Sequence, residues 1–255
     1  MVSLKSPAEI ASMREAGRVV ADTLRVVAEA ARPGVTLREL DALAARHIRA
    51  AGAKPSFLGY RPYAELPPFP GVLCLSVNEV VVHGIPNDRA LRDGDLLSVD
   101  CGAIVDGYHG DAAVTVGVGR VDAEARRLSD ATREALEAAT AQMLPGRRLG
   151  DVAHAVQCVA EAYGYGILRN HGGHGIGTSM HEDPHVPNTG RPGRGYRLRE
   201  GVVLALEPMF VESGRTDYRV LADRWTLATA DGTRAAHFEN TVAVTSDGPR
   251  VLTAV

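Results

Sequence analysis

The sequence predicts a single domain of mixed helices and strands, built as two related halves with a site between them. Three observations lead to this fold: two pairs of amphipathic helical segments, short apolar segments after each pair, and acidic residues at the ends of those apolar segments. The 255 residues are 45% hydrophobic and 23% charged, which is usual for a globular protein with a buried core. We expect one domain over residues 1–255, with halves of about 1–120 and 121–255.

Four segments have the apolar spacing and the end signals of α-helices. The first begins at Ser6, a good N-cap, with Pro7 at the first helical position and Glu9 at the capping-box position. Pro-Gly pairs or single glycines follow these segments and end them. The predicted helices span residues 6–31, 37–51, 122–143 and 149–163.

The two helix pairs repeat at a fixed distance along the chain. A displacement of 112 residues places Pro33-Gly34 on Pro145-Gly146 and Gly52 on Gly164. Each half then continues to a His-Gly-Ile sequence and to an apolar strand that ends in an acid. Two helices joined by a Pro-Gly turn are also frequent in proteins without repeats, so a chance match remains an alternative to a true repeat. The period is too long for a solenoid.

Apolar and β-branched segments predict the strands. Asp106-Gly107 is a favoured two-residue turn, and it pairs Val105 with Tyr108 in a hairpin. Counting back along the hairpin, Asp100 and Asp111 project to the same face. The predicted strands span residues 72–76, 80–82, 96–105, 108–118, 202–207, 219–221, 225–228 and 237–244.

Four carboxylates lie at apolar strand positions. Asp100 and Asp111 would repel each other and would be costly to bury without a cation. Glu207 and Glu239 end or interrupt similar apolar segments. Singly, each acid could instead be an exposed, edge or capping residue. Together they carry a charge of −4, which two divalent cations would balance, so the four acids favour a dinuclear metal site.

A run of glycine and histidine at residues 171–177 adds His174 as a candidate ligand among glycines that allow close backbone approach. A phosphate cradle is a weaker alternative, because the run has no Lys and no helix start. Residues 181–185 match the zinc motif His-Glu-x-x-His, which requires a helix. Pro184 inside the motif argues against that helix.

Charge and cysteine usage exclude several classes of protein. The net charge of −3 gives no general attraction to nucleic acid or membrane, although residues 191–199 contain four arginines. Three cysteines without a Cys-x-x-Cys exclude a disulfide framework and a thiolate zinc knuckle. With no signal-peptide core and no apolar stretch of membrane length, we expect a cytoplasmic protein without a membrane partner.

Five ordered motifs resemble the type I methionine aminopeptidases of bacterial type, which lack an N-terminal extension, and the resemblance covers nearly the whole chain. That family has the α+β pita-bread fold, with two pseudo-symmetric halves around a dinuclear metal site. The matching stretches are residues 78–86, 99–100 with 106–111, 173–177 with 181–184, 206–209, and 238–241.

The resemblance implies a hydrolase that removes the N-terminal methionine of nascent proteins and peptides when the second residue is small. It implies two divalent ions, of Co, Mn, Fe or Zn, and a hard ligand set that favours Mn, Fe or Co over a thiolate-type zinc site. Glu207 is expected to be the general base, with His181 and His83 as catalytic, substrate-contacting histidines. The partners implied are nascent chains and the ribosome exit region, and we expect a monomer. The implied metal ligands are Asp100, Asp111, His174, Glu207 and Glu239, and the implied methionine pocket contains Tyr60, Phe69, Cys74 and Trp225, with Phe57 beside them.

The sequence departs from the family in three places. His237 stands where the family usually has Gln, Met180 where an aromatic residue often lines the pocket, and several extra residues lie within residues 61–68. There is no room for the insertion of type II enzymes. Proline-specific peptidases share the fold and metal set but usually carry a large N-terminal domain, and non-catalytic paralogues lose ligands. A proline-specific peptidase remains an alternative with another substrate, and a non-catalytic binding protein remains an alternative of another class.

Overall fold

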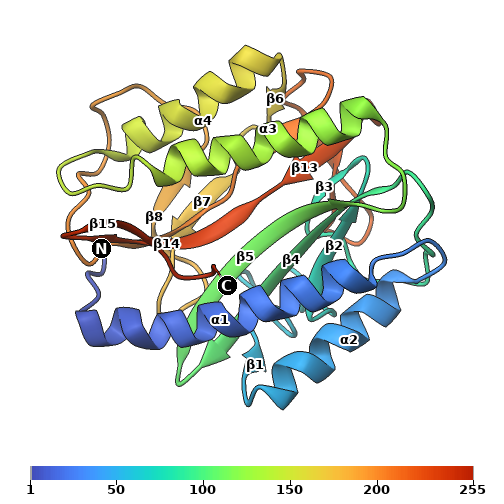
Figure 1. The fold of residues 1–255 in the computed structure, drawn as a ribbon, viewed down its shortest axis with the longest axis horizontal. Helices are drawn as coiled ribbons and strands as arrows, with labels where there is room; N and C mark the ends of the chain where they lie inside the picture. The colour runs from blue at the N-terminus through green and yellow to red at the C-terminus, as the bar shows by residue number, and fades with distance from the viewer. Residues whose placement is uncertain (1, 255) are drawn as a thin grey trace.

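A sheet of nine strands forms the centre of the structure, and four helices lie along one of its sides (Figure 1). The computed structural model describes residues 2–254. Strand order in this sheet is β1-β4-β5-β14-β9-β7-β8, with β2 also paired to β4 and β15 to β14. Two three-stranded sheets, β13-β10-β6 and β11-β12-β3, complete the strands of the described part. The strands are β1 (Lys54–Pro55), β2 (Leu73–Val77), β3 (Val80–Val82), β4 (Leu96–Val105), β5 (Tyr108–Gly117), β6 (Gly166–Ile167), β7 (Gly172–Gly175), β8 (Glu182–Pro187), β9 (Val203–Leu206), β10 (Met209–Val211), β11 (Tyr218–Val220), β12 (Leu227–Thr229), β13 (Ala235–His237), β14 (Glu239–Thr245) and β15 (Gly248–Val251).

The predicted helices are present, and the first begins with the expected cap. The helices are α1 (Pro7–Ala30), α2 (Leu37–Ala50), α3 (Ala123–Thr140) and α4 (Leu149–Tyr163). At α1 the Ser6 N–H donates to Glu9 Oε2 at 2.8 Å, and the Glu9 N–H donates to Ser6 Oγ at 3.3 Å, which is the capping box that the sequence predicts. The prediction for α3 was three residues too long, because residues 141–143 leave the helix in a turn.

The hairpin of β4 and β5 has the register derived from its turn. Val105 pairs with Tyr108, Asp100 with Ala113 and Gly102 with Asp111. Asp106 and Gly107 both have positive φ, at 48° and 83°, as the favoured two-residue turn requires. The two aspartates therefore lie on one face of the sheet, as predicted.

Several strands differ from the sequence prediction. The segment predicted as one strand at 237–244 is two strands, β13 and β14, which separate at Phe238 and belong to different sheets. The glycine-rich residues 172–175 form strand β7, which glycine's weak strand propensity does not predict. The His-Glu-x-x-His segment contributes to strand β8 and is not helical, so the argument from Pro184 is confirmed.

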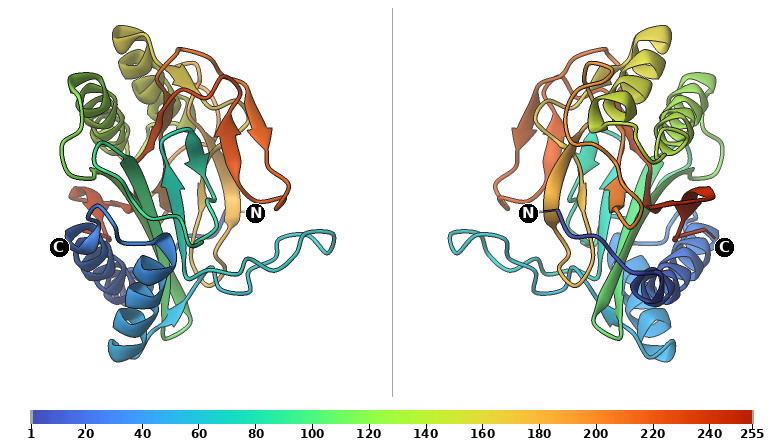
Figure 2. Two further views of the ribbon diagram at one scale, coloured as in Figure 1. Left: turned by 90° about the vertical axis from the view of Figure 1, so that its right-hand side faces the viewer. Right: turned by 90° about the vertical axis from the view of Figure 1, so that its left-hand side faces the viewer.

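Two hydrophobic clusters fix the helix pairs on the sheet. One joins α1 and α2 to β2, β4 and β5, and the other joins α3 and α4 to β9 and β14. Side views show all four helices on one side, while β11, β12 and the extra loop at residues 61–68 lie on the other (Figure 2). No helix within residues 2–254 is long and apolar enough to cross a bilayer. The helices therefore leave the other face of the sheet available for a functional site.

Candidate metal centre and substrate cavity

The sheet register brings the predicted metal ligands to one face. Ala113 on β5 pairs with Asp100 on β4 and, across its other edge, with Glu239 on β14. Asp111 lies two residues from Ala113, so its side chain shares that face. Because Ala113 is small, it leaves space between the carboxylates of the flanking strands.

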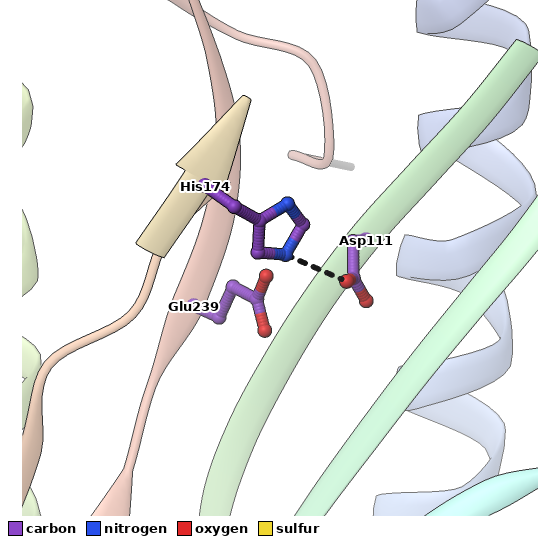
Figure 3. A group of neighbouring side chains, drawn as sticks. All are labelled: Asp111, His174 and Glu239. Carbon is purple, nitrogen blue, oxygen red and sulfur yellow. Dashed lines mark ion pairs between the residues drawn. The ribbon is translucent and has the colours of Figure 1, made fainter. Parts of the chain in front are cut away.

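His174 and Glu207 enter from the other half of the sheet. His174 on β7 pairs with Ala205 on β9, and Glu207 follows the end of β9. The His174 Nε2 atom lies 3.8 Å from Asp111 Oδ2 and 3.7 Å from Glu207 Oε1. The potential ligand atoms of Asp111, His174 and Glu239 all lie within 4.8 Å of one another (Figure 3).

The His174 ring has the proton placement that a metal ligand needs. Its Nδ1 lies 2.9 Å from the Gly175 carbonyl oxygen, which can only accept a hydrogen bond. The proton is therefore assigned to Nδ1, and the lone pair of Nε2 points toward the carboxylates. Burial lowers the pKa of His174 to about 3, which keeps the ring neutral.

The buried carboxylates have fewer hydrogen-bond donors around them than their oxygens could accept. Asp100, Asp111 and Glu239 are 8%, 3% and 3% exposed, and one oxygen of each is buried with no hydrogen-bond partner within the described residues. Burial raises the pKa of Asp100 to about 7 and raises the pKa values of Asp111, Glu207 and Glu239 well above the usual range, with mutual repulsion adding to the effect. Without a cation, burial therefore favours the protonated acids. Bound divalent cations would let them ionise, and carboxylate oxygens around one neutral imidazole fit such cations.

The cavity beside these acids joins them to an apolar pocket. A cavity of about 290 Å³ is lined by Asp100, Asp111, His174, Glu207 and Glu239 on one side. Its other side contains a buried cluster of apolar residues. The cavity thus brings together all five predicted ligands and every predicted pocket residue. The apolar residues are Phe57, Phe69, Cys74, Met180 and Trp225, with Tyr60 partly buried against them.

Aromatic packing and a loop contact hold the pocket. The Phe69 and Trp225 rings meet edge to face with centroids 5.3 Å apart. The Trp225 Nε1–H donates to the Pro67 carbonyl oxygen at 2.9 Å. Pro67 belongs to the extra loop, so the departure at residues 61–68 contributes directly to the pocket wall. Tyr63, on the same loop, also lines the cavity although it is 68% exposed. Sequence patterns did not identify Tyr63, because an exposed loop tyrosine carries no pattern.

The two predicted catalytic histidines line the same cavity. His181 Nδ1 lies 2.7 Å from the Tyr60 hydroxyl, and its ring stacks on Tyr60. His83 has a positive φ of 60° and packs edge to face against Trp225. Burial lowers the pKa of each histidine to about 4, so both are neutral at pH 7, although His181 as a whole residue is exposed.

Comparison with known proteins places this geometry in a family. The model of metallopeptidase family M24 matches residues 11–246. The chain is 52% identical to methionine aminopeptidase 1 of Mycobacterium tuberculosis, over 99% of this chain and 95% of that protein. It is 44% identical to methionine aminopeptidase 1 of Bacillus subtilis over the full length of both chains.

Solved structures agree with the fold. The methionine aminopeptidase of Thermotoga maritima superposes with a TM-score of 0.95 at 42% identity, over 100% of both chains. A prolidase from Pyrococcus furiosus has a TM-score of 0.79 at 22% identity, covering 99% of this chain and 65% of that one, and shows the shared pita-bread fold alone. By its full-length sequence match, its fold and its cluster of buried acids around His174, this chain belongs to metallopeptidase family M24.

Proposed function

We propose that this protein is a methionyl aminopeptidase, which hydrolyses the first peptide bond of proteins and peptides that begin with methionine followed by a small residue. The observation that carries this proposal is one cavity in which an apolar aromatic pocket adjoins five metal-ligating side chains. The close relatives named as methionine aminopeptidases support it. The low identity to the prolidase limits that comparison to the fold.

The proposed metal ligands are Asp100, Asp111, His174, Glu207 and Glu239. Their four carboxylates balance two divalent ions in charge, and the identity of the metal stays open. When bound, such ions lower the pKa of a water molecule and can hold the free α-amine of a substrate, which restricts action to N-termini. Ligand atoms of Asp111 and Glu239 lie within 4.8 Å of each other and of His174, so these two carboxylates would help to hold the ions.

Glu207 is the proposed general base. It lines the cavity with its side chain 14% exposed, so it can contact a water molecule beside the scissile carbonyl. Its backbone carbonyl accepts a hydrogen bond from Asn188 Nδ2 at 2.9 Å, which fixes the chain after β9. Glu207 takes the proton of the attacking water and later returns it to the leaving amine.

His181 is placed to stabilise the negative charge that develops on the carbonyl oxygen. Burial raises the pKa of the Tyr60 phenol, so its hydroxyl stays protonated and donates to His181 Nδ1. The His181 proton is then on Nε2, where it can donate to the oxyanion. His83 contacts the scissile amide and assists proton transfer there. Because His83 is neutral at pH 7, the transferred proton comes from Glu207.

The methionine side chain is proposed to occupy the pocket of Phe57, Tyr60, Phe69, Cys74 and Trp225. An unbranched thioether fills such a pocket and makes favourable contacts with aromatic edges. Burial raises the pKa of the Cys74 thiol, which therefore remains an uncharged, apolar wall. The residue after methionine would lie beside the metal ligands and under His83, where a long side chain collides.

Peptide hydrolysis tests the proposal. Metal-free protein is supplied separately with Mn, Fe, Co or Zn and given Met-Ala-Ser or Ala-Pro-Ser. Cleavage of Met-Ala-Ser alone supports the proposal, and preference for Ala-Pro-Ser would assign a proline-specific peptidase. A Met-X-Ser library should rank Ala, Ser and Gly well above Leu, Lys and Phe. Equal cleavage across the library would refute the steric argument, and efficient release of N-terminal Leu or Phe would refute the pocket.

We also propose that the protein acts in the cytoplasm as a monomer on nascent chains at the ribosome exit region. Four exposed arginines support an electrostatic contact with ribosomes, although the net charge is −3. Salt-sensitive co-sedimentation with ribosomes that is lost on replacing these arginines with glutamate is the expected result. Light scattering tests the monomer, and cell fractionation tests the compartment. The four residues are Arg191, Arg194, Arg197 and Arg199.

A further inference from the structure

His237 is a buried imidazole beside the proposed metal centre and is not one of the five proposed ligands. It ends β13 and is 2% exposed, and its Nε2 atom is buried with no hydrogen-bond partner within the described residues. Its backbone is fixed by Thr115 on β5. The His237 N–H donates to Thr115 Oγ1 at 3.0 Å, and that hydroxyl donates to the His237 carbonyl oxygen at 2.7 Å. The backbone that carries the ring is therefore held in place.

The carboxylates of two proposed ligands lie close to Nε2. Nε2 lies 3.9 Å from Glu207 Oε2 and 3.8 Å from Glu239 Oε2. The other oxygen of Glu207, Oε1, faces His174 at 3.7 Å. Glu207 thus has one oxygen toward the ligand cluster and the other toward His237.

The surroundings of the two neutral rings assign them different tautomers. His174 Nδ1 faces a backbone carbonyl, which fixes its proton there and leaves Nε2 as a lone pair. No hydrogen bond holds a proton on Nδ1 of His237 among residues 2–254, and its Nε2 faces two acceptor oxygens. When bound cations keep Glu207 and Glu239 ionised, a neutral imidazole in that place is most stable with its proton on Nε2, because a lone pair there would face the carboxylate lone pairs.

We infer that His237 is a positioning residue whose Nε2–H donates to Glu207 and Glu239 and holds their opposite oxygens toward the metal ions. This inference rests on the proposed metallopeptidase function. The distances are about 1 Å longer than a charge-assisted hydrogen bond of ~2.8 Å, and rotation of the glutamate carboxylates about their soft terminal torsion can close the gap. A donor behind a ligating carboxylate orients it and raises metal affinity.

Metal titration of three variants tests the assignment. His237→Leu removes the donor, and His237→Gln restores an N–H donor of similar reach. His154→Gln is the matched control, because His154 on α4 also has a buried ring nitrogen without a hydrogen-bond partner among residues 2–254. Each metal-free protein is titrated with Mn(II) alone by calorimetry, and the visible absorption of the Co(II) form is recorded.

We expect His237→Leu to bind Mn(II) about 10- to 100-fold more weakly than the parent, as when other outer-shell partners of metal ligands are removed. His237→Gln should recover most of this loss without changing the Co(II) spectrum, and His154→Gln should match the parent. Parent-like affinity in His237→Leu would overturn the inference. An altered Co(II) spectrum with equal weakening in His237→Gln would make His237 a direct ligand and also overturn it.

If His237→Leu does not fold, nitrogen NMR of the Zn(II)-loaded parent replaces it. A proton on His237 Nε2 supports the donor role, whereas a metal-bound Nε2 or a proton on Nδ1 refutes it. Failure of the parent itself to bind Mn(II) would instead overturn the proposed function. The two failures are therefore distinguishable.

Discussion

Replacement of Asp100 by asparagine is expected to stabilise the metal-free protein increasingly as the pH rises from about 4 to 7. Burial raises the pKa of Asp100 from 3.8 to about 7 in the folded chain. A raised carboxyl pKa favours the protonated form in the folded state. Ionising Asp100 in the folded chain therefore lowers stability. This loss is absent below the unfolded pKa near 4, grows between pH 4 and pH 7 and is complete above pH 7.

The size of the effect follows from the shift. One pKa unit corresponds to about 1.36 kcal/mol, so the ionised Asp100 costs on the order of 4 kcal/mol at pH 8 without metal. Asparagine has the same shape and cannot ionise, and its own burial cost does not vary with pH. The histidines far from Asp100 titrate alike in both proteins, so their effect cancels when the two are subtracted. Asp111, Glu207 and Glu239 lose the repulsion of Asp100 in the variant, which adds to its stabilisation.

Urea unfolding in the presence of a chelator, at several pH values from 4 to 8, measures this difference. Asp247→Asn, at an exposed position in the turn before β15, is the control and should give a difference near zero at every pH. Adding Mn(II) at pH 8 should narrow the difference. The parent gains about 2.7 kcal/mol when free metal is 100 times its dissociation constant, and Asp100→Asn gains less.

Two results would refute the reasoning. A difference in unfolding free energy that does not change between pH 4 and 8 would show that Asp100 ionises without cost in the folded chain. Equal stabilisation of the parent and Asp100→Asn by Mn(II) would show that Asp100 is not a metal ligand.

Three further predictions concern the reaction. Chelation should abolish peptidase activity and Mn, Co or Fe(II) should restore it, because the buried acids repel one another without cations; full activity of a verified metal-free preparation would contradict this. His181→Ala and His83→Ala should keep their metal content, measured by mass spectrometry, while His181→Ala loses about 3–4 kcal/mol of transition-state stabilisation in kcat. Loss of metal from His181→Ala would make it a ligand. Tyr60→Phe should lower kcat by about five- to tenfold through loss of the hydrogen bond to His181, and an unchanged kcat would show that this bond does not set the tautomer.

Local sequence determined the parts of the site that neighbouring residues can specify. The Asp106-Gly107 turn fixed the register of β4 and β5 and so placed Asp100 and Asp111 on one face. Capping residues and Pro-Gly pairs marked the helices, because these signals act within a few residues. The division into halves at about residue 120 remains a prediction.

Resemblance to a family, and not local pattern, named the roles of His83 and His181 and the residues of the pocket. The structure places them around one cavity. Strands β7 and β8 could not be predicted, because glycine and proline have low strand propensity and only pairing with β9 and with each other makes them strands.

Only the tertiary structure decided how the distant residues meet. Glu239 reaches Asp111 because β14 pairs with β5, and His174 reaches Glu207 because β7 pairs with β9. The contact of the extra loop with Trp225 and the direction of the His237 ring are likewise set by packing across long sequence separations. Such pairings depend on how whole strands bury their apolar faces. The free energy of that burial cannot be predicted from any local pattern of residues.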